Sequence, residues 1–127
     1  MAYLLDTNVI INYLNASLPL ASMDFLNAIV DNEPMISIVT KIETLGFNFI
    51  SLDEQNTMET FINGTATLDL NNDIVNKTID IRKSKKIKLP DAIIAATALG
   101  YDLILISRNT ADFVGIKGLQ VIDPYAL

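Results

Sequence analysis

Two short runs of consecutive apolar residues, each stopped by a polar side chain, are the most regular feature of the chain. Residues 3–5 lead into Asp6, and residues 103–106 lead into Ser107. Neither run alternates between apolar and polar positions, which is typical of strands buried on both faces of a parallel sheet. Because ligands of open α/β sheets bind outside the carboxyl ends of the strands, we expect Asp6 and the polar turn over residues 107–112 to share one edge.

The rest of the chain alternates between helical spacing and short strands. This alternation predicts an α/β protein, a three-layer α/β/α sandwich around a central, mostly parallel sheet. At 127 residues, a single domain over residues 1–127 is expected. Further strands are expected at residues 35–36, 65–70 and 119–122, and helices are marked by residues 9–14, 26–31, 38–49, 53–63, 73–79 and 91–99.

The same spacing predicts which side chains two of these helices bury. In the helix after residue 37, the expected apolar stripe is Ile38, Ile42, Leu45 and Phe49. In the helix that begins near residue 73, the expected inward set is Ile74, Val75, Thr78 and Ile79. Each set recurs at intervals of about three to four residues, as one helix face requires.

The chain contains neither cysteine nor histidine, and this narrows the possible chemistry. Disulfides, zinc–thiolate sites, histidine general bases and Ser-His-Asp or Cys-His catalysis are excluded. The net charge of −6 argues against a broad basic surface for nucleic acid, but it leaves room for binding through metal ions and a small basic patch. No apolar stretch approaches the roughly 18 residues of a membrane span and the N-terminus lacks a basic signal region, so we expect a cytoplasmic protein without membrane contact.

Four acidic residues fall where a sheet edge would gather them: Asp6, Glu43, Asp91 and Asp112. Each has a simpler interpretation, as a helix cap, a solvated side chain, a first-turn acid or a turn residue. Glu43 and Asp91 nevertheless lie among apolar residues, where a carboxylate without a partner is costly. Gathered carboxylates repel one another unless a cation is present, so the pattern indicates a hard divalent cation such as Mg²⁺.

Uncharged polar residues accompany these acids along the chain. Their hydroxyls and amides could orient carboxylates or metal-bound water without adding charge. Capping and turn formation are the alternative roles, and they are the favoured ones for Asn109. The residues concerned are Thr7, Asn8, Ser107 and Asn109.

Four stretches taken together resemble a PIN-domain ribonuclease, and most of all the VapC-like toxins of toxin–antitoxin pairs. They are Leu4-Leu5-Asp6-Thr7-Asn8-Val9-Ile10-Ile11, Ile42-Glu43, Leu89-Pro90-Asp91-Ala92-Ile93-Ile94-Ala95-Ala96-Thr97-Ala98 and Ser107-Arg108-Asn109-Thr110-Ala111-Asp112-Phe113.

The resemblance implies that Asp6, Glu43, Asp91 and Asp112 form the family's catalytic quartet, which binds Mg²⁺ or Mn²⁺. Asp6, Asp91 and Asp112 are the expected metal ligands, whereas Glu43 is the acid expected to stay off the metal. The fourth acid varies in position within such families, so Asp112 is the weakest match of the four. The resemblance is compatible with one bound ion or with two. The resemblance also implies a single-stranded RNA substrate, a homodimer, and an antitoxin that covers the acidic groove.

Basic residues are concentrated just before Asp91. Six of the nine lysines and arginines lie between residues 77 and 88, namely Lys77, Arg82, Lys83, Lys85, Lys86 and Lys88. Such a run is commonly a solvated helix end, but a cationic strip beside an acidic site would also suit an RNA backbone. Lys86 and Lys88 are therefore candidate substrate contacts, together with Arg108 in the last of the four stretches.

Four competing functions can be compared with the residues themselves. A haloacid-dehalogenase-like phosphatase needs a second Asp two residues after the first, where this chain has Asn8. A phosphoacceptor receiver domain needs a Lys near position 107, where the chain has Ser107. The remaining alternatives keep the PIN-like fold, either as a protein-binding module without catalysis or as a non-toxin nuclease in RNA processing.

Overall fold

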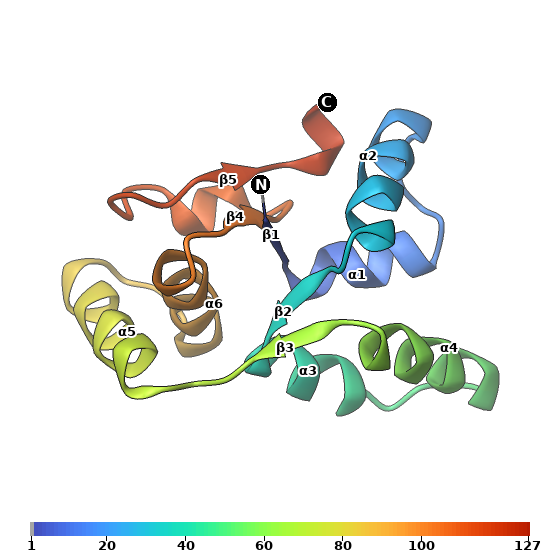
Figure 1. The fold of residues 1–127 in the computed structure, drawn as a ribbon, viewed down its shortest axis with the longest axis horizontal. Helices are drawn as coiled ribbons and strands as arrows, with labels where there is room; N and C mark the ends of the chain where they lie inside the picture. The colour runs from blue at the N-terminus through green and yellow to red at the C-terminus, as the bar shows by residue number, and fades with distance from the viewer. Residues whose placement is uncertain (1) are drawn as a thin grey trace.

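The computed structural model describes residues 2–127 and is built around one five-stranded sheet (Figure 1). The strands follow the order β3-β2-β1-β4-β5, and every neighbouring pair is parallel. The two unbroken apolar runs form β1 and β4, which are therefore neighbours in the middle of the sheet. The strand bounds are β1 Tyr3–Leu5, β2 Met35–Ser37, β3 Ala66–Leu68, β4 Ile104–Ile106 and β5 Val121–Ile122.

Helices occupy nearly all of the connections between the strands. Two helices follow each of the first three strands, and two short 3-10 helices, η1 and η2, follow β4 and β5. No helix within residues 2–127 has the length and apolar character needed to cross a membrane. The bounds are α1 Thr7–Leu14, α2 Leu20–Asp31, α3 Ile38–Leu45, α4 Leu52–Asn63, α5 Asn72–Ser84, α6 Leu89–Gly100, η1 Thr110–Phe113 and η2 Pro124–Ala126.

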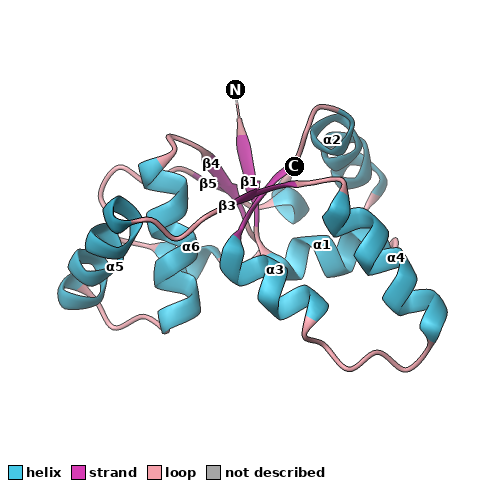
Figure 2. Ribbon diagram, turned by 60° about the horizontal axis from the view of Figure 1, so that its bottom comes forward, coloured by secondary structure: helices cyan, strands magenta, loops and turns pink. Residues whose placement is uncertain are grey.

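Apolar side chains pack on both faces of the sheet, which makes three layers (Figure 2). Leu4 and Leu105 point to the face covered by α5 and α6, whereas Leu5, Ile104 and Ile106 point to the face covered by α1, α2 and α4. Successive residues of a strand point to opposite faces, so two apolar faces require an unbroken apolar run. The predicted α/β/α sandwich is confirmed, and the sheet is wholly parallel.

Two predicted helix faces are wrong in part. In α3 the buried residues are Thr40 and Thr44, whereas Ile42 is 65% exposed and Leu45 is 37% exposed. This helix contacts both α1 and α6, and the short hydroxyl side chains on that side bond locally, with Thr44 Oγ1 donating to the Thr40 carbonyl oxygen at 2.8 Å. Apolar spacing therefore identified the helix but placed its apolar face on the wrong side.

The predicted inward set of α5 needs a similar correction. Ile74, Thr78 and Ile81 are buried, whereas Val75 is 37% exposed and Ile79 is 45% exposed. Residues 74, 78 and 81 lie on one narrow stripe, which is all that a helix packed against a single neighbour has to bury. That neighbour is α6, whose last residue, Gly100, leaves no space for a side chain beside Ile74.

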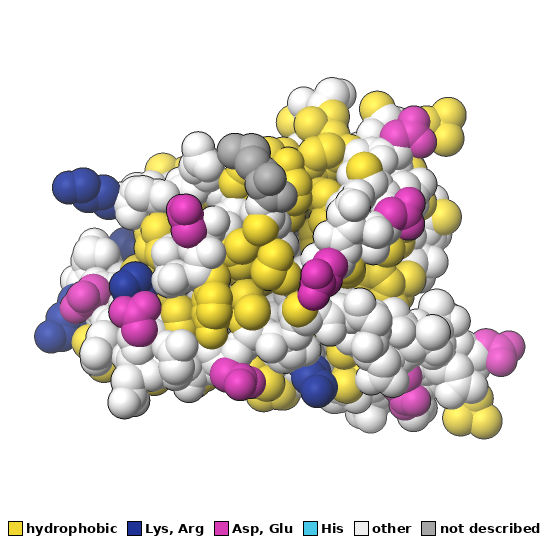
Figure 3. All heavy atoms as spheres, viewed as in Figure 1, with side chains coloured by type: hydrophobic (Ala, Val, Ile, Leu, Met, Phe, Trp, Pro, Cys, Tyr) yellow, Lys and Arg dark blue, Asp and Glu magenta, His cyan; other side chains and the backbone are white. Residues whose placement is uncertain are grey.

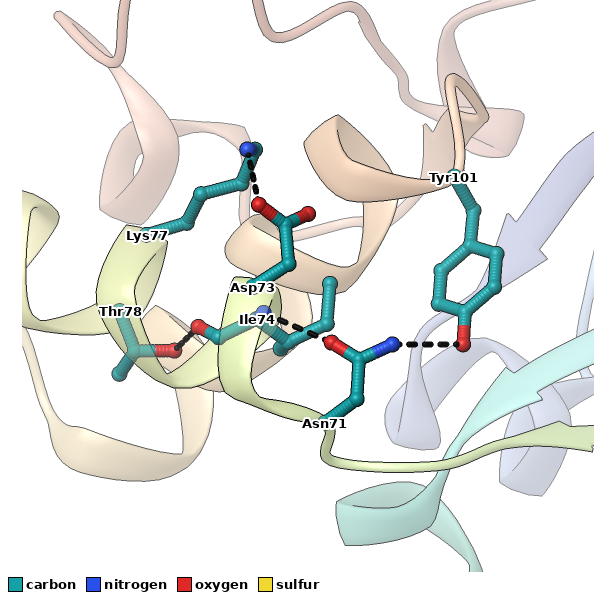
Figure 4. Close-up of polar contacts among 6 residues, drawn as sticks. All are labelled: Asn71, Asp73, Ile74, Lys77, Thr78 and Tyr101. Atoms are coloured by element: carbon teal, nitrogen blue, oxygen red, sulfur yellow. Dashed lines mark hydrogen bonds and ion pairs between the residues drawn. The ribbon is translucent and has the colours of Figure 1, made fainter.

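The start of α5 shows how local polar contacts hold this layer together (Figure 4). Asn71 caps the helix by accepting a hydrogen bond of 2.9 Å from the Ile74 amide, and its side-chain amide lies 3.4 Å from the Tyr101 hydroxyl. One turn on, Lys77 Nζ lies 2.9 Å from Asp73 Oδ1. N-capping and an i,i+4 pair are the contacts expected of a well-formed surface helix.

Candidate active site

Asp6 is held rigidly at the carboxyl end of the central strand β1. One carboxylate oxygen accepts a hydrogen bond of 2.8 Å from the Thr7 amide, which caps α1, and the other accepts a hydrogen bond of 2.7 Å from Ser107 Oγ. The Asp6 amide in turn donates to the Ile106 carbonyl oxygen at 3.0 Å. Asp6 is 5% exposed and Ser107 is fully buried, so capping accounts for only one of the two carboxylate oxygens.

Glu43 reaches the same edge from α3. Its Oε1 accepts a hydrogen bond of 2.7 Å from Thr7 Oγ1, which also lies 3.2 Å from the hydroxyl of the buried Thr40. Glu43 itself is exposed, as is its neighbour Ile42. The interpretation of Glu43 as a carboxylate beside a core-facing stripe is therefore wrong, although the Thr7 contact links it to the residue next to Asp6.

Asp91 and Asp112 line a second part of the edge, between α6 and η1. Asp91 lies in the first turn of α6 and is partly exposed, and Asp112 lies in η1 and is exposed. Both line a pocket of about 430 Å³. Three lysines, Lys85, Lys86 and Lys88, line the same pocket.

Electrostatics show that the four acids act on one another. Burial raises the pKa of the Asp6 carboxyl; the hydrogen bonds from Ser107 and Thr7 oppose the shift, and the charges of Glu43 and Asp112 add to it. Burial also raises the pKa of Asp91, with further increases from Asp6, Asp112 and Glu43 and a smaller opposing effect from Lys88. Asp91 thus lies within electrostatic range of the other three acids, and Asp6 within range of Glu43 and Asp112, although these residues are far apart in the sequence.

The acids nevertheless stand apart in space. Within residues 2–127, no three acidic side chains come close enough together to enclose an ion. The one ion pair of the described chain joins Lys77 to Asp73 on α5, so none of the four site carboxylates is paired with a lysine or arginine. Mutually repelling carboxylates without a counter-charge favour separated positions, and Mg²⁺ needs only one or two carboxylates beside its waters.

The uncharged candidates differ in what they contact. Thr7 and Ser107 bond directly to site carboxylates. Asn8 Oδ1 is buried and has no hydrogen-bond partner among the described residues. Asn109 takes part through its backbone, whose amide donates to Ser107 Oγ at 3.1 Å, while its side chain is exposed. Thr40 was not predicted as a residue of the site, although its position about one helical turn before Glu43 on the same helix could have indicated it.

The basic residues separate into occupied and free groups. Lys77 is paired with Asp73, as Figure 4 shows, and Arg82 Nη1 donates to the Ile87 carbonyl oxygen at 3.0 Å. Lys86 and Lys88 line the pocket, and their ammonium groups make no hydrogen bond or ion pair within residues 2–127. On the face drawn in Figure 3, dark-blue side chains gather mainly on the side where α5 lies.

Arg108 is engaged elsewhere than the sequence suggested. Its guanidinium lies 4.0 Å from the centre of the Tyr125 ring, which η2 presents after β5. A cation over an aromatic face is a stabilising arrangement, and it leaves the edge of the guanidinium available for other partners. Nothing in the spacing of the sequence pointed to Tyr125, because η2 reaches Arg108 only through the pairing of β5 with β4.

The fold and this edge define an α/β protein whose carboxylates gather beyond the carboxyl ends of its central parallel strands. The family model of the PIN domain matches residues 3–118, and the chain belongs to the PIN domain family. No curated protein sequence matched the chain.

Solved structures resemble the chain over nearly its whole length. A chain of a toxin–antitoxin complex from Klebsiella pneumoniae is 31% identical, with 98% of each chain covered and a TM-score of 0.77. A chain of DNA-bound VapBC from Salmonella typhimurium shares 24% identity, with 98% of each chain covered and a TM-score of 0.80. FitAcB from Neisseria gonorrhoeae also shares 24% identity, over 98% of this chain and 99% of that one, with a TM-score of 0.81. The last two show the likeness of fold.

Proposed function

We propose that this protein is a metal-dependent endoribonuclease that cleaves single-stranded RNA and acts in the cytoplasm as the toxin of a toxin–antitoxin pair. The observation that carries the proposal is the gathering of Asp6, Glu43, Asp91 and Asp112 at one sheet edge without a paired lysine or arginine. Membership of the PIN domain family and the likeness to a toxin–antitoxin chain support it.

The residues present suit Mg²⁺ or Mn²⁺. Their oxygen atoms are the type of ligand that hard divalent cations prefer, and the unpartnered Asn8 Oδ1 could add a neutral one. Burial raises the pKa of both Asp6 and Asp91, and the charges of neighbouring acids add to each shift, so a bound cation would offset an unfavourable accumulation of negative charge. Asp6, Asp91 and Asp112 are the proposed ligands. One or two of them would contact the cation directly, because no three acidic side chains within residues 2–127 come close enough together to enclose it. When bound, it would supply an acidified water and neutralise charge on a phosphate.

The protein's own side chains divide the remaining work. Ser107 and the Thr7 amide fix the orientation of the Asp6 carboxylate, and the Thr7 hydroxyl fixes that of Glu43. In a chain without histidine, Glu43 is the site acid that is exposed and not assigned to the metal, so it could take up a proton near the reacting phosphate. Lys86, Lys88 and the free edge of Arg108 are the proposed contacts for phosphates of the RNA strand.

The molecule also carries surface that suits protein partners. Phe47, Ile50 and Leu52, around the α3–α4 connection, are 59%, 96% and 73% exposed. Apolar side chains grouped in this way commonly mark an interaction surface. An antitoxin and a second copy of the chain are the proposed partners. The mass of the purified protein in solution tests the second, and a monomer at micromolar concentration would contradict the proposed homodimer.

Cleavage of a labelled single-stranded RNA, with and without Mn²⁺ or Mg²⁺, tests the activity. We expect cleavage by wild-type protein only with metal, and cleavage by the Asp6→Asn variant that is slower by roughly a thousandfold. Asp24→Asn, at an exposed position of α2, is the matched control and should cleave normally.

Two results would redirect the proposal. Wild-type protein that leaves RNA intact at millimolar metal would favour a PIN-like module that only binds protein. Cleavage without growth arrest on expression would favour a non-toxin nuclease of RNA processing. The same metals should also raise the melting temperature, because a ligand that binds only the folded state stabilises it.

A further inference from the structure

Lys85 joins the turn between α5 and α6 to the segment that carries Asp112. Its Nζ donates hydrogen bonds to the carbonyl oxygen of Asp112 at 2.9 Å and to that of Val114 at 2.7 Å. Hydrogen bonds from a charged donor are shorter and stronger than those between neutral groups. The two bonds cross 27 and 29 positions of sequence, so they connect parts of the site that the chain itself does not hold together.

The segment around Asp112 has few other supports. Its regular structure is the single 3-10 turn η1, closed by the Asp112 amide donating to the Asn109 carbonyl oxygen at 3.0 Å. Phe113 and Ile116 are buried beneath it, but Asp112 and Val114 are exposed. Buried apolar contacts hold the underside of the segment, and Lys85 supplies a polar attachment on the pocket side.

Lys85 also differs from its basic neighbours. Two of the three ammonium donors of Lys85 are used within the protein, and this residue is partly buried. Lys86 and Lys88 are exposed, and their ammonium groups make no hydrogen bond within residues 2–127. The turn that carries Lys85 is itself braced by the bond from Arg82 to the Ile87 carbonyl oxygen. This turn leads directly into α6 and Asp91, so Lys85 is anchored beside one acid and holds the backbone of another.

We propose that Lys85 is a positioning residue, which sets the Asp112 carboxylate relative to Asp91 by holding the Asp112 and Val114 carbonyl groups. The inference rests on the proposed function, because it assigns Asp112 to the metal site. Its consequence is specific: loss of the Lys85 ammonium should weaken the binding of the divalent cation more than the binding of RNA.

Three variants of the full chain test this role. Lys85→Met removes the donors but keeps most of the stem, Lys85→Arg keeps a cationic donor, and Lys117→Met removes one charge from an exposed position nearby as the matched control. Hydrogen–deuterium exchange of the metal-free protein should show the amides of residues 112–116 exchanging about tenfold faster in Lys85→Met, as loss of charged hydrogen bonds implies. Lys85→Arg should restore part of the protection, and Lys117→Met should match wild type.

Metal binding is then measured by the Mn²⁺ dependence of the melting temperature and of RNA cleavage. We expect Lys85→Met to need roughly tenfold more Mn²⁺ for half-maximal effect in both assays, in line with the loosened segment. The KM for RNA at saturating Mn²⁺ should stay close to wild type. Because exchange and melting need no cleavage, they test Lys85 even if wild-type protein fails to cut RNA, which would overturn the proposed nuclease alone.

Other outcomes would overturn the assignment. If only the KM for RNA rises, Lys85 contacts the substrate. If the melting temperature falls while the Mn²⁺ dependence is unchanged, the tether is merely structural. Equal behaviour of Lys85→Met and Lys117→Met would show that the two hydrogen bonds have no role in placing Asp112.

Discussion

The two halves of the candidate site are built in opposite ways. At the end of β1, Asp6 is buried and both of its oxygens are hydrogen-bonded. Across the edge, Asp112 lies exposed on a short 3-10 turn, beside a pocket lined by lysines. The Asp6 carboxylate is therefore preorganised before a ligand binds, whereas the Asp112 carboxylate is held by contacts that allow it to move.

This difference suits a site that must hold a cation and also admit a long substrate. A preorganised carboxylate saves the cost of ordering it during the reaction. Asp112, which is held less firmly and lies beside unpaired lysines, can adjust its position to an RNA strand that passes through the pocket. We therefore expect substitutions in the buried half to have larger and more uniform effects on RNA cleavage than substitutions in the exposed half.

The largest effects are expected from the single substitutions Asp6→Asn and Asp112→Asn, compared with each other. Asp6→Asn should lower the rate of RNA cleavage by roughly a thousandfold, because several kcal/mol of charge stabilisation would be lost. Asp112→Asn should lower it by roughly ten- to a hundredfold. Single-turnover cleavage at saturating metal measures both, and equal losses would remove the distinction between the two halves.

Removal of the Ser107 hydroxyl tests the support of the buried half. Ser107→Ala deprives one Asp6 oxygen of its partner, and an unsatisfied buried group costs about 1–3 kcal/mol. We therefore expect a lower free energy of unfolding together with slower cleavage, whereas Ser84→Ala, at the exposed end of α5, should change neither. Denaturant titration gives the first quantity; unchanged stability of Ser107→Ala would mean that water replaces the hydroxyl.

A smaller effect is expected from the free lysines. Lys86→Ala combined with Lys88→Ala should raise the KM for RNA several-fold and leave kcat nearly unchanged. If both ammonium groups contact phosphates, the slope of log affinity against log salt should fall by about 1.4, at roughly 0.7 for each contact with a single strand. An unaltered slope would assign these lysines to the solvated surface.

The smallest effect concerns pH in the absence of metal. The folded-state pKa values of Asp6 and Asp91 are raised, so the folded chain binds protons more readily than the unfolded chain. Their contribution to stability is fully present below the ordinary Asp pKa of about 3.9 and is lost as pH rises through the folded-state values. We expect the melting temperature of metal-free wild type, measured against Asp6→Asn, to decline on raising the pH; parallel curves would contradict the shift.

The amino-acid sequence by itself determined the strands, their parallel arrangement and the acids placed after them. A strand made of an unbroken run of three or four apolar residues has apolar side chains on both faces, and both are buried only when the parallel sheet is covered on both sides. The residue that follows such a run must lie at the carboxyl end of the strand. The positions of Asp6 and Ser107 could therefore be predicted from the sequence. Helix existence was also accessible, because Asn71, Ser37 and Gly100 mark helix ends.

Only the tertiary structure decided which face of α3 is buried and what the basic residues do. The spacing of apolar residues predicts a helix, but the face that is buried depends on which elements pack against it. In α3 the buried face is the one that carries Thr40 and Thr44. Likewise, the roles of Lys85 and Arg108 depend on groups 17 to 29 positions away, the backbone after Asp112 and the Tyr125 ring. A local pattern carries no information about such contacts, because they form only when the sheet brings distant segments together.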